Sequence, residues 1–202
     1  MQFYEVIQNR KSIKSFKKSP IEKDRLSRMI NAAMQSPSWK NHTSYKFILV
    51  EDEREKRELS KAIMNETPEA SKSIEEAPMV AVVVGEPLNS GVITDKEYYL
   101  VDGAIAMEHF VLAATNEGYG TCWIAAVNED QVRNILSIPH EFRVIAMTPI
   151  GEVEEKSEHE DKKDVREHVF INQWGKAYTE NSYLKNSYID PSYTANDIHP
   201  IH

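Results

Sequence analysis

Residues 98–126 read YYLVDGAIAMEHFVLAATNEGYGTCWIAA, and this stretch decides the fold. Its first part, residues 98–116, predicts a helix whose apolar side chains cover most of the circumference, so we expect it to be buried nearly all round. A helix this apolar in a small domain is typical of a subunit interface. Residues 118–126 then predict a glycine turn that leads into a strand.

Helices and strands alternate along the rest of the chain. We expect helices at 2–9, 22–34, 53–64 and 129–136, and strands at 45–50, 79–84, 143–150 and, at the edge of the sheet, 169–171. The strand at 79–84 is apolar on both faces and is therefore expected at the centre of the sheet. Four or five strands interleaved with helices predict a mixed α/β sandwich. No Gly-x-Gly-x-x-Gly follows the first strand, which argues against a classical dinucleotide-binding fold.

The sequence predicts one domain, residues 1–175, followed by a C-terminal tail. A chain of 202 residues is long enough for one sizeable core. Residues 152–168 are almost entirely charged and are expected to form a solvated connector. The tail, residues 176–202, is rich in Tyr, Asn, Ser and Pro. It is either a disordered end or an arm laid over a partner subunit.

Composition narrows the class of partner. The net charge of -8 argues against nucleic acid or an anionic membrane as the main partner. The start of the chain lacks the apolar core of a signal peptide, and the longest aliphatic run, residues 77–84, is too short to span a bilayer. Cys122 is the only cysteine, so no intrachain disulfide can form. We therefore expect a soluble, cytoplasmic protein.

A short basic motif, Arg10-Lys11-Ser12-Ile13-Lys14-Ser15-Phe16, lies near the N-terminus. In an extended or turning backbone, Arg10, Ser12 and Lys14 would place their polar groups on one side. These groups suit a phosphate, because Arg can grip two oxygens in a fork and Lys adds a point charge. The alternative is a solvated surface, which is the commoner role of a short Lys/Arg run.

Further landmarks along the chain favour the phosphate site. The chain resembles the FMN-dependent nitroreductase family in five motifs that occur in the same order: Arg10/Ser12/Lys14, Pro37-Ser38-Trp39-Lys40-Asn41-His42-Thr43-Ser44-Tyr45, Asp102-Gly103-Ala104-Ile105-Ala106, Gly118-Tyr119-Gly120-Thr121-Cys122-Trp123-Ile124-Ala125-Ala126 and Pro139-His140-Glu141-Phe142-Arg143-Val144. The resemblance covers residues 3–170. It implies a three-layer sandwich, in which helices flank a mostly antiparallel sheet, and a homodimer that holds FMN at its interface.

The resemblance also implies which residues bind the cofactor. Those expected to contact the phosphate, the ribityl chain and the pyrimidine side of the ring are Arg10, Lys11, Ser12 and Lys14. Those expected to contact the isoalloxazine from the opposite subunit are Pro37, Ser38 and Asn41. Backbone groups near Ala125 and Ala126 would meet the hydride-accepting nitrogen. A late basic pair, Lys162 and Lys163, would complete the phosphate clamp, with Arg166 as a competing candidate.

Two motifs depart from the family pattern. Thr43 replaces the usual Gln, and Ser44-Tyr45 replaces Pro-Trp, which puts in question the contacts of this loop with the polar edge of the ring. Ala125 and Ala126 replace two glycines. An alanine can still offer its N–H, but it cannot adopt a left-handed backbone cheaply.

The activity implied by the resemblance is hydride transfer from NADH or NADPH through FMN to a nitroaromatic, quinone or similar acceptor. No side chain need act as a nucleophile or dedicated base, because the flavin carries the chemistry. Lys14 near the pyrimidine side would favour reduction electrostatically. Two alternatives remain: specialised flavin chemistry on the same fold, such as dehalogenation or flavin fragmentation, and a flavin-binding or regulatory protein without turnover.

Three other features have simpler interpretations. Trp39 stacks near the ring or a substrate, or else packs in the dimer. Cys122 lies within a predicted strand and is expected to be an inert core thiol. The histidines have no metal-ligand spacing, so no metal site is predicted.

Overall fold

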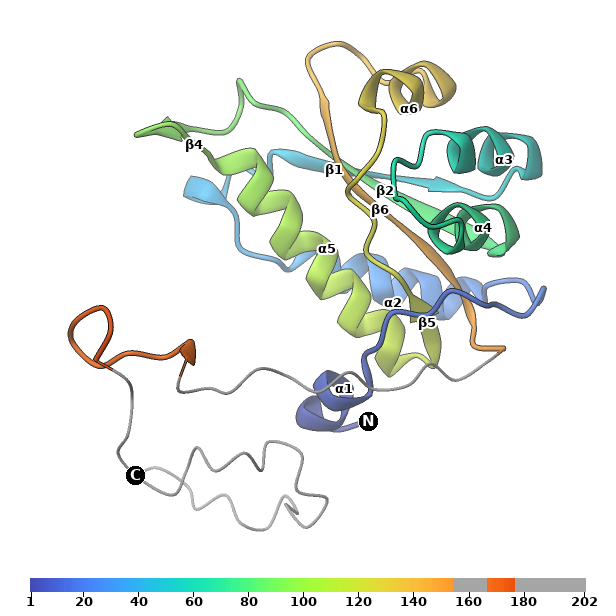
Figure 1. The fold of residues 1–202 in the computed structure, drawn as a ribbon, viewed down its shortest axis with the longest axis horizontal. Helices are drawn as coiled ribbons and strands as arrows, with labels where there is room; N and C mark the ends of the chain where they lie inside the picture. The colour runs from blue at the N-terminus through green and yellow to red at the C-terminus, as the bar shows by residue number, and fades with distance from the viewer. Residues whose placement is uncertain (155–166, 177–202) are drawn as a thin grey trace. The chain divides into compact units, whose positions relative to one another are not determined.

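A four-stranded antiparallel sheet forms the centre of the protein. The computed structural model describes residues 1–154 and 167–176. The strands run in the order β1-β2-β6-β5, and each neighbouring pair is antiparallel (Figure 1). Their bounds are Tyr45–Val50 for β1, Met79–Gly85 for β2, Tyr119–Thr121 for β5 and Arg143–Glu152 for β6. The interior position of β2 agrees with its apolar sequence.

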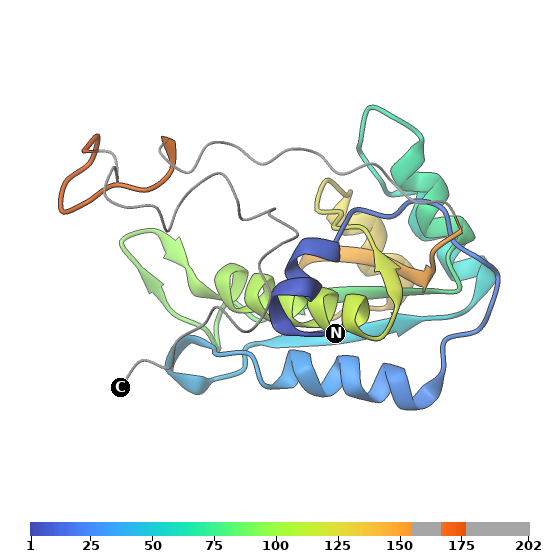
Figure 2. The same cartoon turned by 90° about the horizontal axis from the view of Figure 1, so that it is seen from below.

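Helices cover both faces of this sheet. Their bounds are Lys23–Met34 for α2, Glu53–Lys61 for α3, Glu69–Glu76 for α4, Tyr98–Asn116 for α5 and Glu129–Leu136 for α6. Successive side chains of β2 point to opposite faces, so Val80 and Val82 pack with the α3, α4 and α6 layer, and Ala81 and Val83 with α2 and α5. In Figure 2, α2 (blue) lies on the other side of the strands from α3 and α4 (teal). The predicted three-layer sandwich is confirmed.

Four short elements complete the described chain. They are α1 (Phe3–Asn9), the 3-10 turn η1 (Trp39–Asn41), β3 (Val92–Ile93) and β4 (Lys96–Glu97). The strands β3 and β4 form a small antiparallel hairpin whose turn residues, Thr94 and Asp95, have positive φ angles of 51° and 63°. Neither this hairpin nor α4 is expected from the periodicity of the sequence.

The long helix α5 has the predicted bounds but not the predicted burial. One side packs against α2 and the sheet through residues such as Met107 and Phe110, both fully buried. On the other side, Leu100 and Val101 are 42% and 47% exposed. The expectation that α5 is buried nearly all round is therefore wrong for the single chain, because the sheet and α2 reach only one side of it.

Several element ends also differ from the expectations. Strand β5, expected to extend to Ala126, ends at Thr121, because the next backbone N–H, that of Cys122, donates to the side-chain oxygen of Thr148 at 3.0 Å. The chain touches the sheet once more, in a bridge between Ile124 and Met147. Helix α3 ends at Lys61, three residues early.

The chain divides into two units, Met1–Ser157 and Glu158–His202. The described residues of the second unit, 167–176, form turns in which the rings of Phe170 and Trp174 lie 4.9 Å apart. The prediction of an edge strand at 169–171 is wrong. Of these three residues only Phe170 takes part in a β-bridge, and the N–H of Ile171 donates a hydrogen bond to the carbonyl of Lys176 across a turn. The predicted boundary at residue 175 stays a prediction.

A buried lysine of α3 forms a hydrogen bond with the backbone just before β2, and we expect this contact to stabilise the fold. Lys56 is 1% exposed, and its ammonium donates to the carbonyl of Ala77 at 2.6 Å and to Glu53 at 2.7 Å. Lys56→Met keeps the stem but leaves the Ala77 carbonyl buried without this donor, so we expect a loss of about 2 kcal/mol in the free energy of unfolding, measured with urea. The matched control is Lys61→Met, whose exposed pair with Glu58 should contribute at most about 1 kcal/mol. Equal effects of the two variants would contradict the role of Lys56.

Candidate functional site

The basic motif runs as an extended chain along the edge of the sheet. The N–H of Ile13 donates to the carbonyl of Thr121 in β5 at 2.8 Å, and Ser12 forms a parallel bridge with Thr121. Ile13 is buried, whereas Ser12 and Lys14 on either side of it are exposed and Arg10 is half-buried. The alternation expected for Arg10, Ser12 and Lys14 is thus present.

Two glycines of β5 allow the motif to lie this close. Gly118 has φ of +86°, a left-handed conformation that turns the chain from α5 into β5. At Gly120, a Cβ atom would lie 2.8 Å from the Cβ of Ile13, closer than side-chain atoms approach one another. The sequence Gly118-Tyr119-Gly120 therefore has one glycine for the turn and one for the contact with the basic motif.

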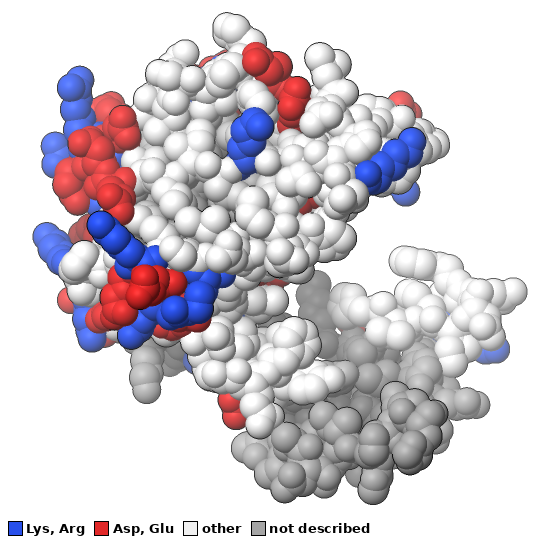
Figure 3. All heavy atoms as spheres, turned by 180° about the vertical axis from the view of Figure 1, so that it is seen from behind, with Lys and Arg blue, Asp and Glu red and all other residues white. Residues whose placement is uncertain are grey.

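The motif contributes two cations, Arg10 and Lys14, and the charge of Arg10 acts on Glu108 and that of Lys14 on Glu69. Several surface cations elsewhere are paired, for example Arg28 with Glu117 at 2.7 Å, and the face in Figure 3 shows groups in which positive and negative side chains lie intermixed. Arg10 and Lys14 form no ion pair with any residue of 1–154 or 167–176. Two unpaired cations beside a serine hydroxyl are suited to bind an anion.

The same charges act on the nearby groups that titrate. Burial raises the pKa of the Cys122 thiol, while the charges of Lys14 and Arg10 and a hydrogen bond with Ser12 act in the opposite direction. A hydrogen bond with Thr67 lowers the pKa of Glu69, and Lys14 adds to that effect. Cys122 is a buried free thiol, as expected, and it lies beside the basic motif.

The second motif is a loop that is fixed to the first turns of α5. The carboxylate of Asp102 accepts a hydrogen bond from the N–H of Trp39 at 2.7 Å and another from the hydroxyl of Ser44 at 2.8 Å. Within the loop, the N–H of Thr43 donates to the hydroxyl oxygen of Ser38 at 2.9 Å. Pro37 and Asn41 are exposed. The loop therefore presents Pro37, Lys40 and Asn41 at the surface, while its backbone is fixed to α5.

Trp39 is held inside its own chain. Its ring stacks on Tyr98 with centroids 4.1 Å apart and planes 21° apart. A Cβ atom at Gly91 would lie 2.6 Å from Nε1 of Trp39, so the indole lies directly on the backbone before β3. His42 adds a hydrogen bond between its Nδ1 and the carbonyl of Asn89 at 2.7 Å. Loop 37–44 and the segment that leads to the hairpin thus form one packed unit.

Ala125 and Ala126 lie in the exposed connection between β5 and α6. The carbonyl of Ala126 accepts a hydrogen bond from Met64 at 2.8 Å, and that of Ala125 accepts one from Val127 at 3.0 Å. Neither N–H of the two alanines donates a hydrogen bond to any other described residue. These two donors are therefore available to a ligand.

The two halves of the candidate site lie at opposite ends of α5. Asp102 holds loop 37–44 near the start of the helix, whereas at its end Asn116 accepts a hydrogen bond from the terminal amine of Met1 at 3.1 Å. Figure 1 shows α1 beside the end of α5, with the basic motif following it toward β5. One chain alone does not bring the two motifs together.

Comparison with known proteins identifies the fold and the family. The model of the family described as "Nitroreductase family" matches residues 7–152, which is most of the chain. The chain belongs to the nitroreductase family. The sequence resemblance is thereby confirmed, and so is the assignment of the chain as an oxidoreductase.

Individual relatives agree with this family. A nitroreductase family protein from Clostridium novyi NT is 48% identical and superposes with a TM-score of 0.76, covering 90% of this chain and 99% of its own. A protein of Methanothermobacter thermautotrophicus named "Putative NADH dehydrogenase/NAD(P)H nitroreductase" is 26% identical over 155 residues, which are 75% of this chain and 77% of the relative. A structure from Clostridium difficile R20291, described as an FMN-dependent nitroreductase, shares the fold with a TM-score of 0.72 at 23% identity and covers 84% of this chain and 98% of its own.

Not every predicted site residue lies in the described structure. Lys162, Lys163 and Arg166 fall within residues 155–166, outside the described residues. Lys11 is half-buried and has interaction partners of its own. Asp102 is a functional candidate to which sequence reasoning assigned no role, although a carboxylate in the first turns of the apolar helix at 98–116 is a signal that could have found one, because a buried charge requires hydrogen-bond donors.

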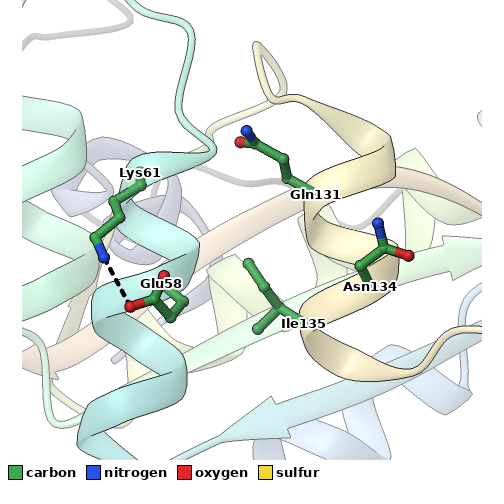
Figure 4. A pocket seen from close by; sticks show the side chains of 5 residues that line it. All are labelled: Glu58, Lys61, Gln131, Asn134 and Ile135. Atoms are coloured by element: carbon green, nitrogen blue, oxygen red, sulfur yellow. Dashed lines mark hydrogen bonds and ion pairs between the residues drawn. The ribbon is translucent and has the colours of Figure 1, made fainter.

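A separate pocket lies between α3 and α6 and contains none of the predicted site residues. Its lining residues are Glu58, Lys61, Gln131, Asn134 and Ile135 (Figure 4). The pair between Lys61 and Glu58, 2.7 Å long, occupies one wall. These side chains are consistent with a solvated depression between two amphipathic helices.

Within 1–154 and 167–176, no group of three or more His, Cys, Asp and Glu side chains is arranged to hold a metal ion. In the same residues, no helix has the length and apolar character that crossing a membrane requires.

Proposed function

We propose that this protein is an FMN-dependent oxidoreductase that takes a hydride from NADH or NADPH and passes it to a nitroaromatic, quinone or similar small acceptor. The observation that carries the proposal is the pair of unpaired cations, Arg10 and Lys14, on a segment fixed to β5. Family membership and the relative named as an NAD(P)H nitroreductase support the donor. The neighbour described as FMN-dependent has the same fold.

The residues present fit FMN at both ends of the cofactor. Arg10, Ser12 and Lys14 provide the positive and hydroxyl groups that a phosphate and the pyrimidine edge require. The unused N–H groups of Ala125 and Ala126 are donors for the edge of the ring. Lys11 is proposed to assist from the same segment, and Lys162 and Lys163 remain proposed members of the clamp.

A homodimer would complete the site. The exposed apolar side chains of α1 and α5, which a stable single chain would bury, are Phe3, Tyr4, Ile7, Leu100 and Val101. A twofold axis near the middle of α5 exchanges the two ends of that helix between subunits. The basic motif of one subunit then faces loop 37–44 of the other, so Pro37, Ser38, Trp39 and Asn41 approach the isoalloxazine from the partner side.

In this arrangement the protein binds and orients, and the cofactor supplies the redox chemistry. When bound, FMN accepts a hydride and passes it on. Lys14 stabilises negative charge at the pyrimidine edge electrostatically, and the alanine N–H groups fix the ring by hydrogen bonds. No described side chain is assigned as a nucleophile. A reducing, cytoplasmic location suits a chain whose single cysteine is a buried free thiol.

The first test is the visible absorption spectrum of the purified protein, followed by anaerobic addition of NADH and then NADPH. We expect a flavin spectrum that bleaches with one of the two donors, because FMN held by Arg10 and Lys14 is exposed to a nicotinamide. Extraction of the flavin then identifies it as FMN. A bound flavin that neither donor bleaches would contradict the proposed reaction, and a colourless protein that cannot be reconstituted with FMN would contradict the proposed cofactor.

A further inference from the structure

We propose that Asp102 is the positioning residue of the active site, and that it acts by holding loop 37–44 in the shape that meets the partner's flavin. This inference rests on the proposed function. The carboxylate is 2% exposed, and its two oxygens take separate donors: the N–H of Trp39 binds Oδ1 at 2.7 Å and the hydroxyl of Ser44 binds Oδ2 at 2.8 Å. The two donors lie five residues apart, so Asp102 fixes both sides of the loop.

The loop needs such a restraint because its backbone is strained. Lys40, Asn41 and Thr43 have φ angles of 49°, 59° and 50°, in the left-handed region that residues other than glycine seldom adopt. Strain of this kind persists only where the surrounding structure enforces it. Besides Asp102, the hydrogen bond from Thr43 to Ser38 acts within the loop itself. Asp102 ties the loop to α5 by hydrogen bonds, in addition to the stacking of Trp39 on Tyr98.

The first turns of α5, which carry Asp102, pack closely against the sheet. The next residue, Gly103, has no side chain, and a Cβ there would lie 2.2 Å from Cδ1 of Ile145 in β6, so the first turns of α5 are pressed onto the sheet. Asp102 forms no ion pair with another residue of the described chain, and an unpaired buried carboxylate opposes folding. The hydrogen bonds from Trp39 and Ser44 therefore compensate the carboxylate for its burial.

Ser44 explains why this chain can form the restraint. The related motif has Pro at this position, and a proline has no hydroxyl group to donate. In this chain Ser44 is buried, and its hydroxyl supplies one of the two hydrogen bonds to Asp102. The departure at Ser44 therefore adds a second point of attachment for the loop.

Loss of Asp102 should affect the contacts with the flavin ring and not those with the phosphate. Loop 37–44 would contact the isoalloxazine, whereas the phosphate is held by the basic motif of the other subunit. Asp102→Ala should therefore weaken FMN binding about tenfold through the loss of one or two buried hydrogen bonds, and at saturating FMN it should shift the visible flavin band. Asp102→Asn keeps an acceptor for Trp39 and should restore most of the affinity.

The test combines FMN titration with amide hydrogen exchange of the apo-protein. Without FMN, we expect the peptide over residues 37–44 to exchange at least about tenfold faster in Asp102→Ala than in the wild type, since opening of the loop is no longer opposed. The matched control is Asp52→Ala. Asp52 also accepts two hydrogen bonds, from Arg54 and Glu55 at 2.9 Å each, but it caps α3 away from this loop.

The outcomes separate this inference from the proposed function. Faster exchange over 37–44 together with weaker FMN binding in Asp102→Ala, but not in Asp52→Ala, supports the role of Asp102. If the wild type binds FMN and Asp102→Ala matches it in exchange, affinity and flavin spectrum, the inference is wrong and the proposed function stands. If the wild type binds no FMN, the proposed function itself fails. Should Asp102→Ala not fold, Ser44→Ala removes one of the two hydrogen bonds, and unchanged exchange and affinity in that variant would overturn the inference.

Discussion

The double variant Arg10→Ala/Lys14→Ala is expected to bind FMN about 1,000-fold more weakly than the wild type, since each cation contributes a charge-assisted hydrogen bond to the phosphate or the ring edge. Neither side chain pairs with a described carboxylate, so their removal leaves no buried partner uncompensated. Titration of the apo-protein with FMN, followed by flavin fluorescence, measures the effect.

The matched control is the double variant Lys17→Ala/Arg28→Ala. It removes the same two units of charge, but Lys17 already pairs with Glu152 at 3.6 Å and Arg28 with Glu117 at 2.7 Å. It should bind FMN within about threefold of the wild type, because the loss of exposed ion pairs has little energetic effect. Equal losses in the two double variants would mean that net charge, and not a phosphate clamp, governs affinity.

Mixed dimers should regain activity that each parent variant has lost. Arg10→Ala damages the basic motif of a subunit, and Pro37→Trp places an indole where the partner's flavin ring would lie. Pro37 is exposed, so the larger side chain does not disturb the core. In a dimer of one subunit of each kind, one site carries both changes and the other carries neither. A purified mixed dimer should therefore show about half the wild-type turnover, as twofold symmetry requires.

Two differently tagged subunits allow the mixed dimer to be purified and compared with both parents at the same concentration. The control is a mixed dimer of wild type and Arg10→Ala, which keeps one intact site and should show the same activity. A mixed dimer of the two variants that is as inactive as its parents would contradict the shared site, because it would place both motifs in one subunit's own site.

The sequence predicts the central elements of the fold well because they carry a clear period. The bounds of β1, α5 and α6 follow directly from apolar spacing and agree with the structure. Helix α4 was missed because its sequence, EASKSIEE, has only Ala70 and Ile74 as apolar residues, too few for a period. The length of β5 was overestimated because a side chain, that of Thr148, takes over the hydrogen bond that would extend the ladder.

The candidate site likewise has a part that the sequence predicts and a part that it does not. Local patterns indicate the exposed polar side of the basic motif, because alternation along an extended segment depends only on neighbouring residues. The restraint of loop 37–44 by Asp102 joins residues 58 and 63 positions apart, so no local pattern contains it. Likewise, the stacking of Trp39 on Tyr98 depends on the path of the chain between them, which the sequence does not reveal.

Helix α5 also sets a constraint on how this chain can change. It has 19 residues, and one of its ends carries the loop while the other carries the N-terminal segment. Adding or deleting one residue between Asp102 and Asn116 would rotate one end against the other by about 100° and move it by about 1.5 Å. Substitutions on the outer side of the helix leave this register intact, whereas a single insertion would misalign both half-sites of the proposed dimer at once. The helix thus fixes both the distance and the rotation angle between its two ends, so it tolerates exchange of side chains but not a change in length.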